Sequence, residues 1–194
     1  MKKVVIVHGW EGYPEEGWFP WLKKELESRG FEVVVPALPD ASNPRIEKWL
    51  PALAQAVGGA DENIYLVGHS LGCQIIVRYL EKLPDEIVVG GAVFVAGFFK
   101  SLSGIENEGK EVQELANHWL ATPVDLKKAS THIKAAVAIF SDNDYYVPLE
   151  NKDDFQKKLK AKIIIEKNQG HFSGGRDQCF KLPAALDAIL KMSS

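Results

Sequence analysis

Six short runs rich in β-branched residues recur along the chain, separated by longer stretches of helical periodicity. The runs lie at residues 4–7, 32–35, 64–67, 88–96, 135–140 and 162–166. Most are apolar at consecutive positions, as strands buried on both faces of a sheet must be. Strands that alternate with helices form a parallel sheet covered by helices on both sides. The first run begins at residue 4, which leaves no room for a hairpin before it. We therefore predict an α/β fold with a wholly parallel sheet of about six strands.

The stretches between these runs have apolar residues at helical spacing. We predict helices over 18–29, 44–57, 70–83, 108–120, 149–160 and 182–191. Asn43 and Pro44 suit the N-cap and first position of the second helix, and Pro51 falls inside it and is expected to kink it. No repeat, low-complexity tract or linker interrupts the pattern, so residues 1–194 are predicted to form a single domain.

Charge and cysteine content exclude several classes of function. The chain has 23 basic and 26 acidic residues, with a net charge of -3 and no like-charge block. We therefore expect neither a nucleic-acid partner nor a membrane-surface partner. Cys73 and Cys179 have no CxxC spacing, so neither a disulfide framework nor a metal site is expected. The apolar run after Met1 is too short for an export signal, and no run is long enough to span a bilayer, which predicts a cytoplasmic protein.

The third run leads directly into Gly68-His69-Ser70-Leu71-Gly72 and then into a predicted helix. This strand, sharp turn and helix is the arrangement of a nucleophile elbow, which exposes a serine hydroxyl at the carboxyl edge of a sheet. Gly68 and Gly72 avoid side chains where the strand and the helix approach most closely. We interpret Ser70 as a catalytic nucleophile. The N–H of Leu71, the residue after it, is a candidate oxyanion donor.

A serine hydroxyl needs a general base, and the base needs an acidic group to orient it. His171 follows the last predicted strand and so lies at the same sheet edge as Ser70. His132 precedes a strand and lies at the opposite edge, so we predict His171 as the base. Two aspartates, Asp142 and Asp144, follow the strand at 135–140 and compete for the role of the acid. The aspartate that does not act as the acid is expected to form a turn by bonding its own backbone.

The elbow and the chain order Ser, Asp, His resemble those of α/β-hydrolases. The acid loop of these enzymes commonly reads G/S-x-x-D-x-x-V-P. Against Ser141 to Pro148 this resemblance implies that Asp144 is the acid and leaves Asp142 as the alternative. The segment His8-Gly9-Trp10 resembles the HGxx oxyanion segment of the same enzymes and implies a second oxyanion donor at the N–H of Trp10. His8 is then a structural, hydrogen-bonded histidine.

The whole chain resembles the small lidless serine hydrolases related to retinoblastoma-binding protein 9. Five segments carry the resemblance: VVIVHGW, Trp49-Leu50-Pro51, GHSLG, DNDYYVP and Gly170-His171-Phe172. It implies an α/β-hydrolase core without a cap domain and with an open site. The Leu-x-Cys-x-Glu element associated with retinoblastoma binding is missing, because Leu71 to Ile75 has no Glu, so that interaction does not carry over.

These observations predict a cofactor-independent serine hydrolase with a small-molecule acyl substrate. A carboxylic ester is favoured, and a thioester or an amide is possible. Aromatic residues at the catalytic edge are candidates for an acyl pocket: Phe98, Phe99, Trp119, Tyr145 and Phe172. A binding module that keeps the hydrolase fold with little or no turnover is the alternative, since a fold does not imply a function. An acyltransferase would use the same acyl-enzyme, and the sequence does not separate transfer from hydrolysis.

Overall fold

A computed structural model describes residues 1–194 and contains one six-stranded sheet. The strand order is β2-β1-β3-β4-β5-β6, and every neighbouring pair is parallel. The strands are β1 (Lys3–Val7), β2 (Glu32–Val34), β3 (Ile64–His69), β4 (Gly91–Val95), β5 (Ala136–Ser141) and β6 (Lys162–Glu166). The predicted all-parallel α/β sheet is confirmed.

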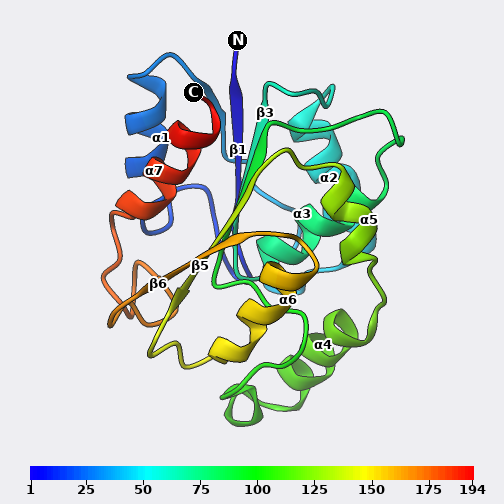
Figure 1. The fold of residues 1–194 in the computed structure, drawn as a ribbon. Helices are drawn as coiled ribbons and strands as arrows, with labels where there is room; N and C mark the ends of the chain where they lie inside the picture. The colour runs from blue at the N-terminus through cyan, green and yellow to red at the C-terminus, as the bar shows by residue number, and fades with distance from the viewer.

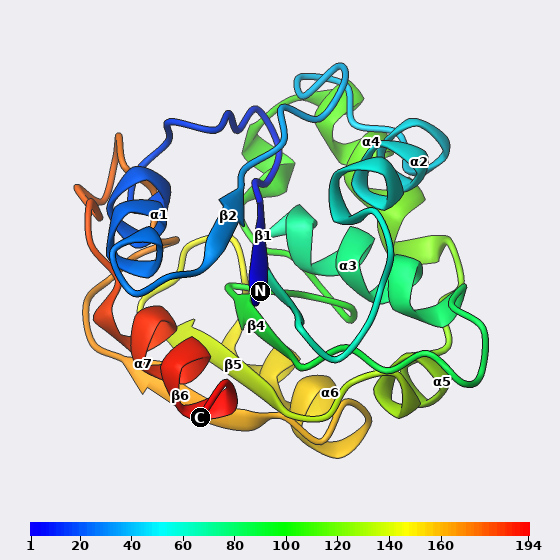
Figure 2. The ribbon, with the colours of Figure 1, turned by 90° about the horizontal axis from the view of Figure 1, so that it is seen from above.

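Helices cover both faces of the sheet. Their bounds are α1 (Phe19–Glu27), α2 (Ile46–Val57), α3 (Leu71–Glu81), α4 (Lys110–Ala121), α5 (Leu126–Thr131), α6 (Lys152–Lys157) and α7 (Pro183–Met192), with 3₁₀ turns η1 (Ile105–Asn107) and η2 (Leu149–Asn151). In Figures 1 and 2, α1 and α7 lie together on one face, although they come from opposite ends of the chain. Helices α2, α3, α5 and α6 lie on the other face.

Each face of the sheet has its own apolar core. On the α1 and α7 side, Trp18 and Phe19 are almost fully buried against side chains of β1, β3 and β4. On the other side, Trp49 of α2 and Trp119 of α4 pack edge to face, with ring centroids 5.8 Å apart. Burying a side chain of this size stabilises the fold by roughly 2–3 kcal/mol. The two cores hold the sheet rigid between the helices, so the loops at its edges start from fixed positions.

Two local predictions differ from the structure, and one helix was not predicted. Asn43 and Pro44 precede α2, whose N-cap is the extended residue Arg45, with no side-chain cap. The helix predicted over 149–160 forms as η2 followed directly by α6, and the chain leaves it before Lys160, which adopts a left-handed φ of 56°. The short helix α5 was not predicted; its N-cap is Asp125, whose carboxylate accepts the N–H of Lys128.

The sheet reverses its winding between β1 and β3. The chain leaves β1 toward β2 on one side and later returns to form β3 on the other side of β1. In open α/β sheets, ligands bind outside the carboxyl ends of the strands at such a switch point. The segment after β1 contains Gly9 and Trp10, and the segment after β3 begins with Ser70. The topology thus places these two segments side by side.

Candidate active site

Ser70 occupies the sharp turn between β3 and α3. Its backbone has a φ of 52° and a ψ of -119°, a conformation that costs free energy for any residue other than glycine. The turn leaves almost no room around it: a Cβ on Gly68 would lie 2.8 Å from the nitrogen of Cys73, and one on Gly72 would lie 2.3 Å from the carbonyl oxygen of Val7. The two glycines are therefore required by the close approach of strand and helix, and strain of the kind seen at Ser70 is typical of functional sites.

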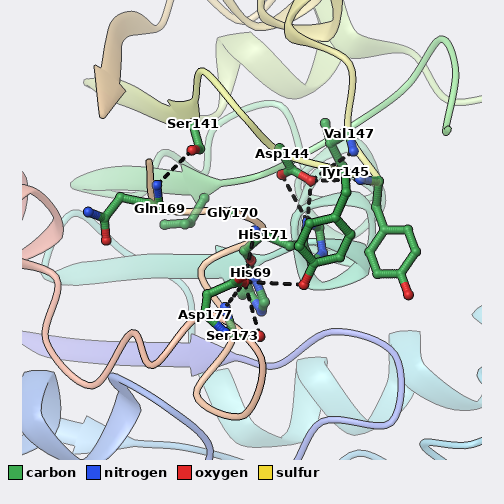
Figure 3. Close-up of polar contacts among 12 residues, drawn as sticks. His69, Ser141, Asp144, Tyr145, Val147, Gln169, Gly170, His171, Ser173 and Asp177 are labelled. Carbon is green, nitrogen blue, oxygen red and sulfur yellow. Dashed lines mark hydrogen bonds and ion pairs between the residues drawn. The ribbon is translucent and has the colours of Figure 1, made fainter. Parts of the chain in front are cut away.

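His171 lies on the loop after β6 and contacts Asp144 on the loop after β5. Its Nδ1 lies 2.9 Å from Asp144 Oδ2 and 3.0 Å from Oδ1. Figure 3 shows the two side chains pointing toward one another. Both side chains are largely buried, with exposed fractions of 11% and 3%. The backbone N–H groups of Tyr146 and Val147 also donate to Asp144 Oδ1. These bonds fix the carboxylate so that it orients the imidazole.

Asp142 occupies a different position on the same loop. Its Oδ1 accepts the N–H of Asn168, on the loop that leads to His171. We expected the aspartate that does not contact the histidine to bond its own backbone, but here Asp144 forms that local turn and Asp142 bonds across to the neighbouring loop. Asn143 Oδ1 likewise accepts the N–H of Gly170. Ser141 Oγ accepts the N–H of Gln169, so consecutive residues of one loop hold the other in register (Figure 3).

Asp177 is a site residue that sequence reasoning missed. Its Oδ2 accepts hydrogen bonds from the backbone N–H groups of His171 and Ser173, from the Ser173 hydroxyl and from the Tyr145 hydroxyl, at 2.9–3.2 Å (Figure 3). The guanidinium of Arg176 stacks 3.7 Å above the ring of Tyr145. A single carboxylate therefore shapes the loop that carries His171. No local motif signals this role, because it depends on four donors that only the folded loop brings together.

Two further buried histidines support the loops around Ser70. His69 Nε2 lies 2.7 Å from the carbonyl oxygen of His171, and its ring centroid lies 5.0 Å from that of His171. Burial, together with the neighbouring His171, lowers the pKa of His69 to about 3, so His69 is neutral and donates this bond. His8 Nε2 accepts the N–H of Leu38, and its Nδ1 lies 2.8 Å from the carbonyl oxygen of Gly9. Burial lowers the pKa of His8 as well.

The segment after β1 approaches Ser70 closely. A Cβ on Gly9 would lie 3.0 Å from Ser70 Cβ and 3.2 Å from the carbonyl oxygen of His69, so a larger residue here would push Ser70 away by a few tenths of an ångström. The next residue, Trp10, has a backbone N–H without an acceptor in the protein, while the following N–H of Glu11 donates to Ala41. Leu71 begins α3, where the first N–H groups of a helix have no partner within the helix. Leu71 follows Ser70 in the chain, and Trp10 follows Gly9, which packs against Ser70.

Ser70 opens into a cleft of about 430 Å³, a size typical of small-molecule sites. Both Phe98 and Tyr145 line this cleft, together with Leu102 and Ile105 from the segment between β4 and α4 and Val112 from the first turn of α4. The other three aromatic residues predicted for an acyl pocket lie elsewhere: Phe99 and Trp119 line a second cavity, and Phe172 is buried in the core beside α1 and α7. Segment 97–134 supplies one wall of the cleft and no cap domain.

Carboxylates also line the cleft. Glu11 and Glu108 are exposed at its rim, and Glu16 is half-buried, whereas no Lys or Arg contributes to the lining. Glu108 accepts a hydrogen bond from the Tyr146 hydroxyl, while Glu16 forms hydrogen bonds only through its backbone, with Tyr13 and Phe19. Burial raises the pKa of Glu16, and the charge of His171 partly offsets that effect. Among His, Cys, Asp and Glu side chains, no group of three is arranged to hold a metal ion.

Residues 4–182 match the family described as serine hydrolase. The chain belongs to this family. Among its relatives, YdeN of Bacillus subtilis is 33% identical over 189 residues, covering 97% of this chain and 94% of that protein. The serine hydrolase RBBP9 of Rattus norvegicus is 28% identical over 173 residues, covering 88% and 87%. The predicted resemblance to the small serine hydrolases is confirmed, and membership supports a hydrolytic enzyme.

Two solved structures agree with the fold. The structure of the Bacillus subtilis ydeN gene product has a TM-score of 0.89 at 31% identity, covering 100% of this chain and 99% of that chain. Est1E of Butyrivibrio proteoclasticus, with a TM-score of 0.75 at 17% identity over 100% and 90% of the two chains, shares the fold. The α/β-hydrolase architecture without a cap domain is therefore confirmed. No helix is both long and apolar enough to cross a membrane.

Proposed function

We propose that this serine hydrolase cleaves small carboxylic esters through an acyl-enzyme on Ser70, with His171 as the base and Asp144 as the acid that orients it. One observation carries the proposal: the strained Ser70 and the Asp144-bound His171 line the same cleft. Each of the three side chains comes from a loop at the carboxyl edge of the sheet. A serine, a histidine and a carboxylate are the groups that nucleophilic acyl transfer requires.

The bond from Nδ1 to Asp144 supports one tautomer of His171. Nδ1 carries the proton, and Nε2 is left to accept the proton of the Ser70 hydroxyl. Ser70 Oγ then bonds to the substrate carbonyl carbon, and the carbonyl oxygen takes the negative charge. The N–H groups of Trp10 and Leu71 stabilise that charge. When the ester bond breaks, the alcohol leaves with the proton held by His171 Nε2, and Ser70 remains acylated.

Hydrolysis of the acyl-enzyme repeats these steps with water as the nucleophile. His171 Nε2 accepts a proton from the water as its oxygen bonds to the acyl carbon, and then returns a proton to Ser70 Oγ as the acid leaves. The apolar side chains of Leu102, Ile105 and Val112 in the cleft favour a substrate with an apolar acyl chain. The absence of a lid leaves the cleft open to water, which favours hydrolysis over transfer to a second alcohol. Esters are favoured over amides because their leaving group needs less protonation.

Labelling with a fluorophosphonate and hydrolysis of p-nitrophenyl butyrate test the proposal. Wild-type protein is expected to be labelled with a stoichiometry of one, and Ser70→Ala is expected to lose labelling and several orders of magnitude in kcat. Ser130→Ala on α5 is a matched control, because its hydroxyl bonds only within its own helix. Comparing kcat/KM for p-nitrophenyl esters, thioesters and amides of the same acyl group ranks the substrate classes.

Ser173 makes the labelling experiment sharper, because it is a second serine in the lining of the cleft. Its hydroxyl already donates to Asp177 and accepts the N–H of that residue, so it is not available as a nucleophile. Labelling that persists in Ser70→Ala and disappears in Ser173→Ala would overturn the assignment. A folded wild-type protein that is neither labelled nor active would instead favour the binding-module alternative.

A further inference from the structure

A second cavity of about 590 Å³ lies on the α3 side of the sheet and shares no lining residue with the Ser70 cleft. Its walls come from α3, the end of α4, the chain that joins α4 to α5, the first turn of α5, α6, and Phe99 after β4. Figure 2 shows these helices grouped on one side of the sheet. Its volume is that of a small-molecule site, and nothing in the proposed hydrolysis uses it.

Two buried polar side chains of α3 line this cavity, Arg78 at 4% and Gln74 at 1% exposure. Arg78 Nη1 donates to the carbonyl oxygen of Pro123, and Nη2 contacts the carbonyl oxygens of Trp119 and Thr122 and Gln74 Oε1. Arg78 Nε and Gln74 Nε2 have no hydrogen-bond partner. Leaving a buried donor unpaired costs about 1–3 kcal/mol, so an acceptor that bonds to these two donors would stabilise the protein.

The charges around the cavity favour an anionic acceptor. No carboxylate lies within 4.0 Å of Arg78. The three carboxylates that line the cavity are already engaged: Asp154 pairs with Lys158 at 2.9 Å, Asp125 caps α5, and Glu81 accepts the N–H of Asp125. Burial lowers the pKa of Arg78, and Glu81 partly offsets that effect. A buried guanidinium without a close counter-charge is costly, and an anion beside it reduces that cost.

Apolar side chains make up much of the remaining wall. Phe99, Trp119 and Leu126 face the cavity, and the exposed ammonium of Lys127 stands at its border. Guanidinium and amide N–H groups pair well with a planar carboxylate. The terminal torsion of glutamine is soft, so the Gln74 amide can turn its donors toward the cavity. We propose that this cavity binds a small organic carboxylate, with its charged group at Arg78 and Gln74 and its apolar body against Phe99 and Trp119.

Benzoate is the probe, and amide resonances of the ¹⁵N-labelled full-length protein are the readout. Benzoate is expected to cause saturable shifts at residues that line this cavity, including the indole N–H of Trp119, while resonances of the Ser70 cleft stay in place. Benzamide, which is neutral and nearly the same shape, is expected to bind at least tenfold more weakly. The same shifts are expected in Ser70→Ala protein, so the outcome does not depend on the proposed hydrolysis.

Two variants test the buried donors at Arg78 and Gln74 and the charge of Lys127 at the border of the cavity. Gln74→Glu supplies a carboxylate to Arg78 from within the chain, so it is expected to abolish benzoate binding while the protein stays folded. Lys127→Glu reverses a charge at the border of the cavity and is expected to weaken binding about fivefold. Lys128→Glu changes the net charge equally on the next residue, which does not line the cavity, and is expected to bind benzoate like the wild type.

Each contrary result overturns the proposal. Equal affinity for benzamide would show an apolar cavity without a carboxylate site. Shifts confined to the Ser70 cleft would show binding at the hydrolytic site only. Unchanged affinity in folded Gln74→Glu, equal effects of the Lys127 and Lys128 substitutions, or no saturable shift with benzoate would each rule out the assigned site.

Discussion

The carboxylate of Asp177 accepts the backbone N–H of His171 at 2.9 Å, while the side chain of His171 contacts a different carboxylate, Asp144, at 2.9 Å. One acidic residue therefore fixes the backbone of the proposed base, and another fixes its ring. Because the imidazole must face both Ser70 and Asp144, a small movement of this loop would separate the groups. Asp177 is thus a positioning residue for the proposed reaction.

Replacing Asp177 is expected to damage both stability and activity. Asp177→Ala leaves four donors without their acceptor and is expected to lower the free energy of unfolding by about 2–4 kcal/mol. It is also expected to lower kcat more than it raises KM, because the loop no longer holds His171 in place. Urea unfolding and steady-state kinetics with p-nitrophenyl butyrate measure the two effects.

Two variants accompany that measurement. Asp177→Asn keeps an acceptor oxygen and is expected to recover part of kcat. Asp187→Ala removes an exposed carboxylate on α7 and is expected to change neither quantity. A kcat for Asp177→Ala equal to that of the wild type would refute the positioning role.

The two neighbouring aspartates are expected to respond differently to the same change. Asp144→Asn is expected to lower kcat by about 10⁴-fold, because an amide does not hold the required tautomer of His171. Asp142→Asn is expected to lose less than about tenfold, since its amide oxygen still accepts the N–H of Asn168. Measuring kcat for both variants shows which aspartate acts as the acid. A larger loss in Asp142→Asn would assign the acid to Asp142.

The carboxylates of the cleft are expected to discriminate substrates by charge. Among p-nitrophenyl esters of matched acyl length, kcat/KM is expected to be highest with a terminal trimethylammonium group, intermediate with a neutral group and lowest with a carboxylate. Glu16→Gln is expected to reduce the ratio of cationic to anionic kcat/KM about threefold, whereas Glu15→Gln, outside the cleft, leaves it unchanged. A ratio insensitive to Glu16 and to ionic strength would contradict this prediction.

Acid is expected to destabilise the fold through His69. The pKa of His69 is about 3 in the folded state and near 6.5 when exposed, so the unfolded chain binds an extra proton between these values. Stability is therefore retained above pH 6.5 and falls as the pH drops below it, by up to about 1.4 kcal/mol per pH unit for this group. His8, whose pKa is also lowered, acts in the same direction.

Urea unfolding at pH 7, 6 and 5 checks this prediction. His69→Gln keeps an N–H donor for the carbonyl oxygen of His171 but does not titrate. Its stability is expected to fall less steeply than that of the wild type below pH 6.5. Parallel slopes for the two proteins would show that His69 does not contribute.

Much of the fold and the order of the site residues follow from the sequence because they depend on local patterns. Buried parallel strands need consecutive apolar residues, so the six runs were readable, and the glycines around Ser70 identify a turn that few sequences form. The position of His171 after the last strand follows from the same pattern. The end of the helix predicted over 149–160 was less predictable, because a left-handed backbone at Lys160 is not signalled by its side chain.

The sequence by itself determined the all-parallel sheet, the elbow at Ser70 and two candidate aspartates. Only the tertiary structure decided which aspartate contacts His171, which aromatic residues line the cleft, and that Asp177 holds the loop. Strand periodicity and turn chemistry depend on residues that are neighbours in the chain, so they can be predicted from the sequence. The contacts of Asp144, Asp177 and Phe98 join loops that meet only after the strands have paired, because their geometry depends on where the whole sheet places each loop.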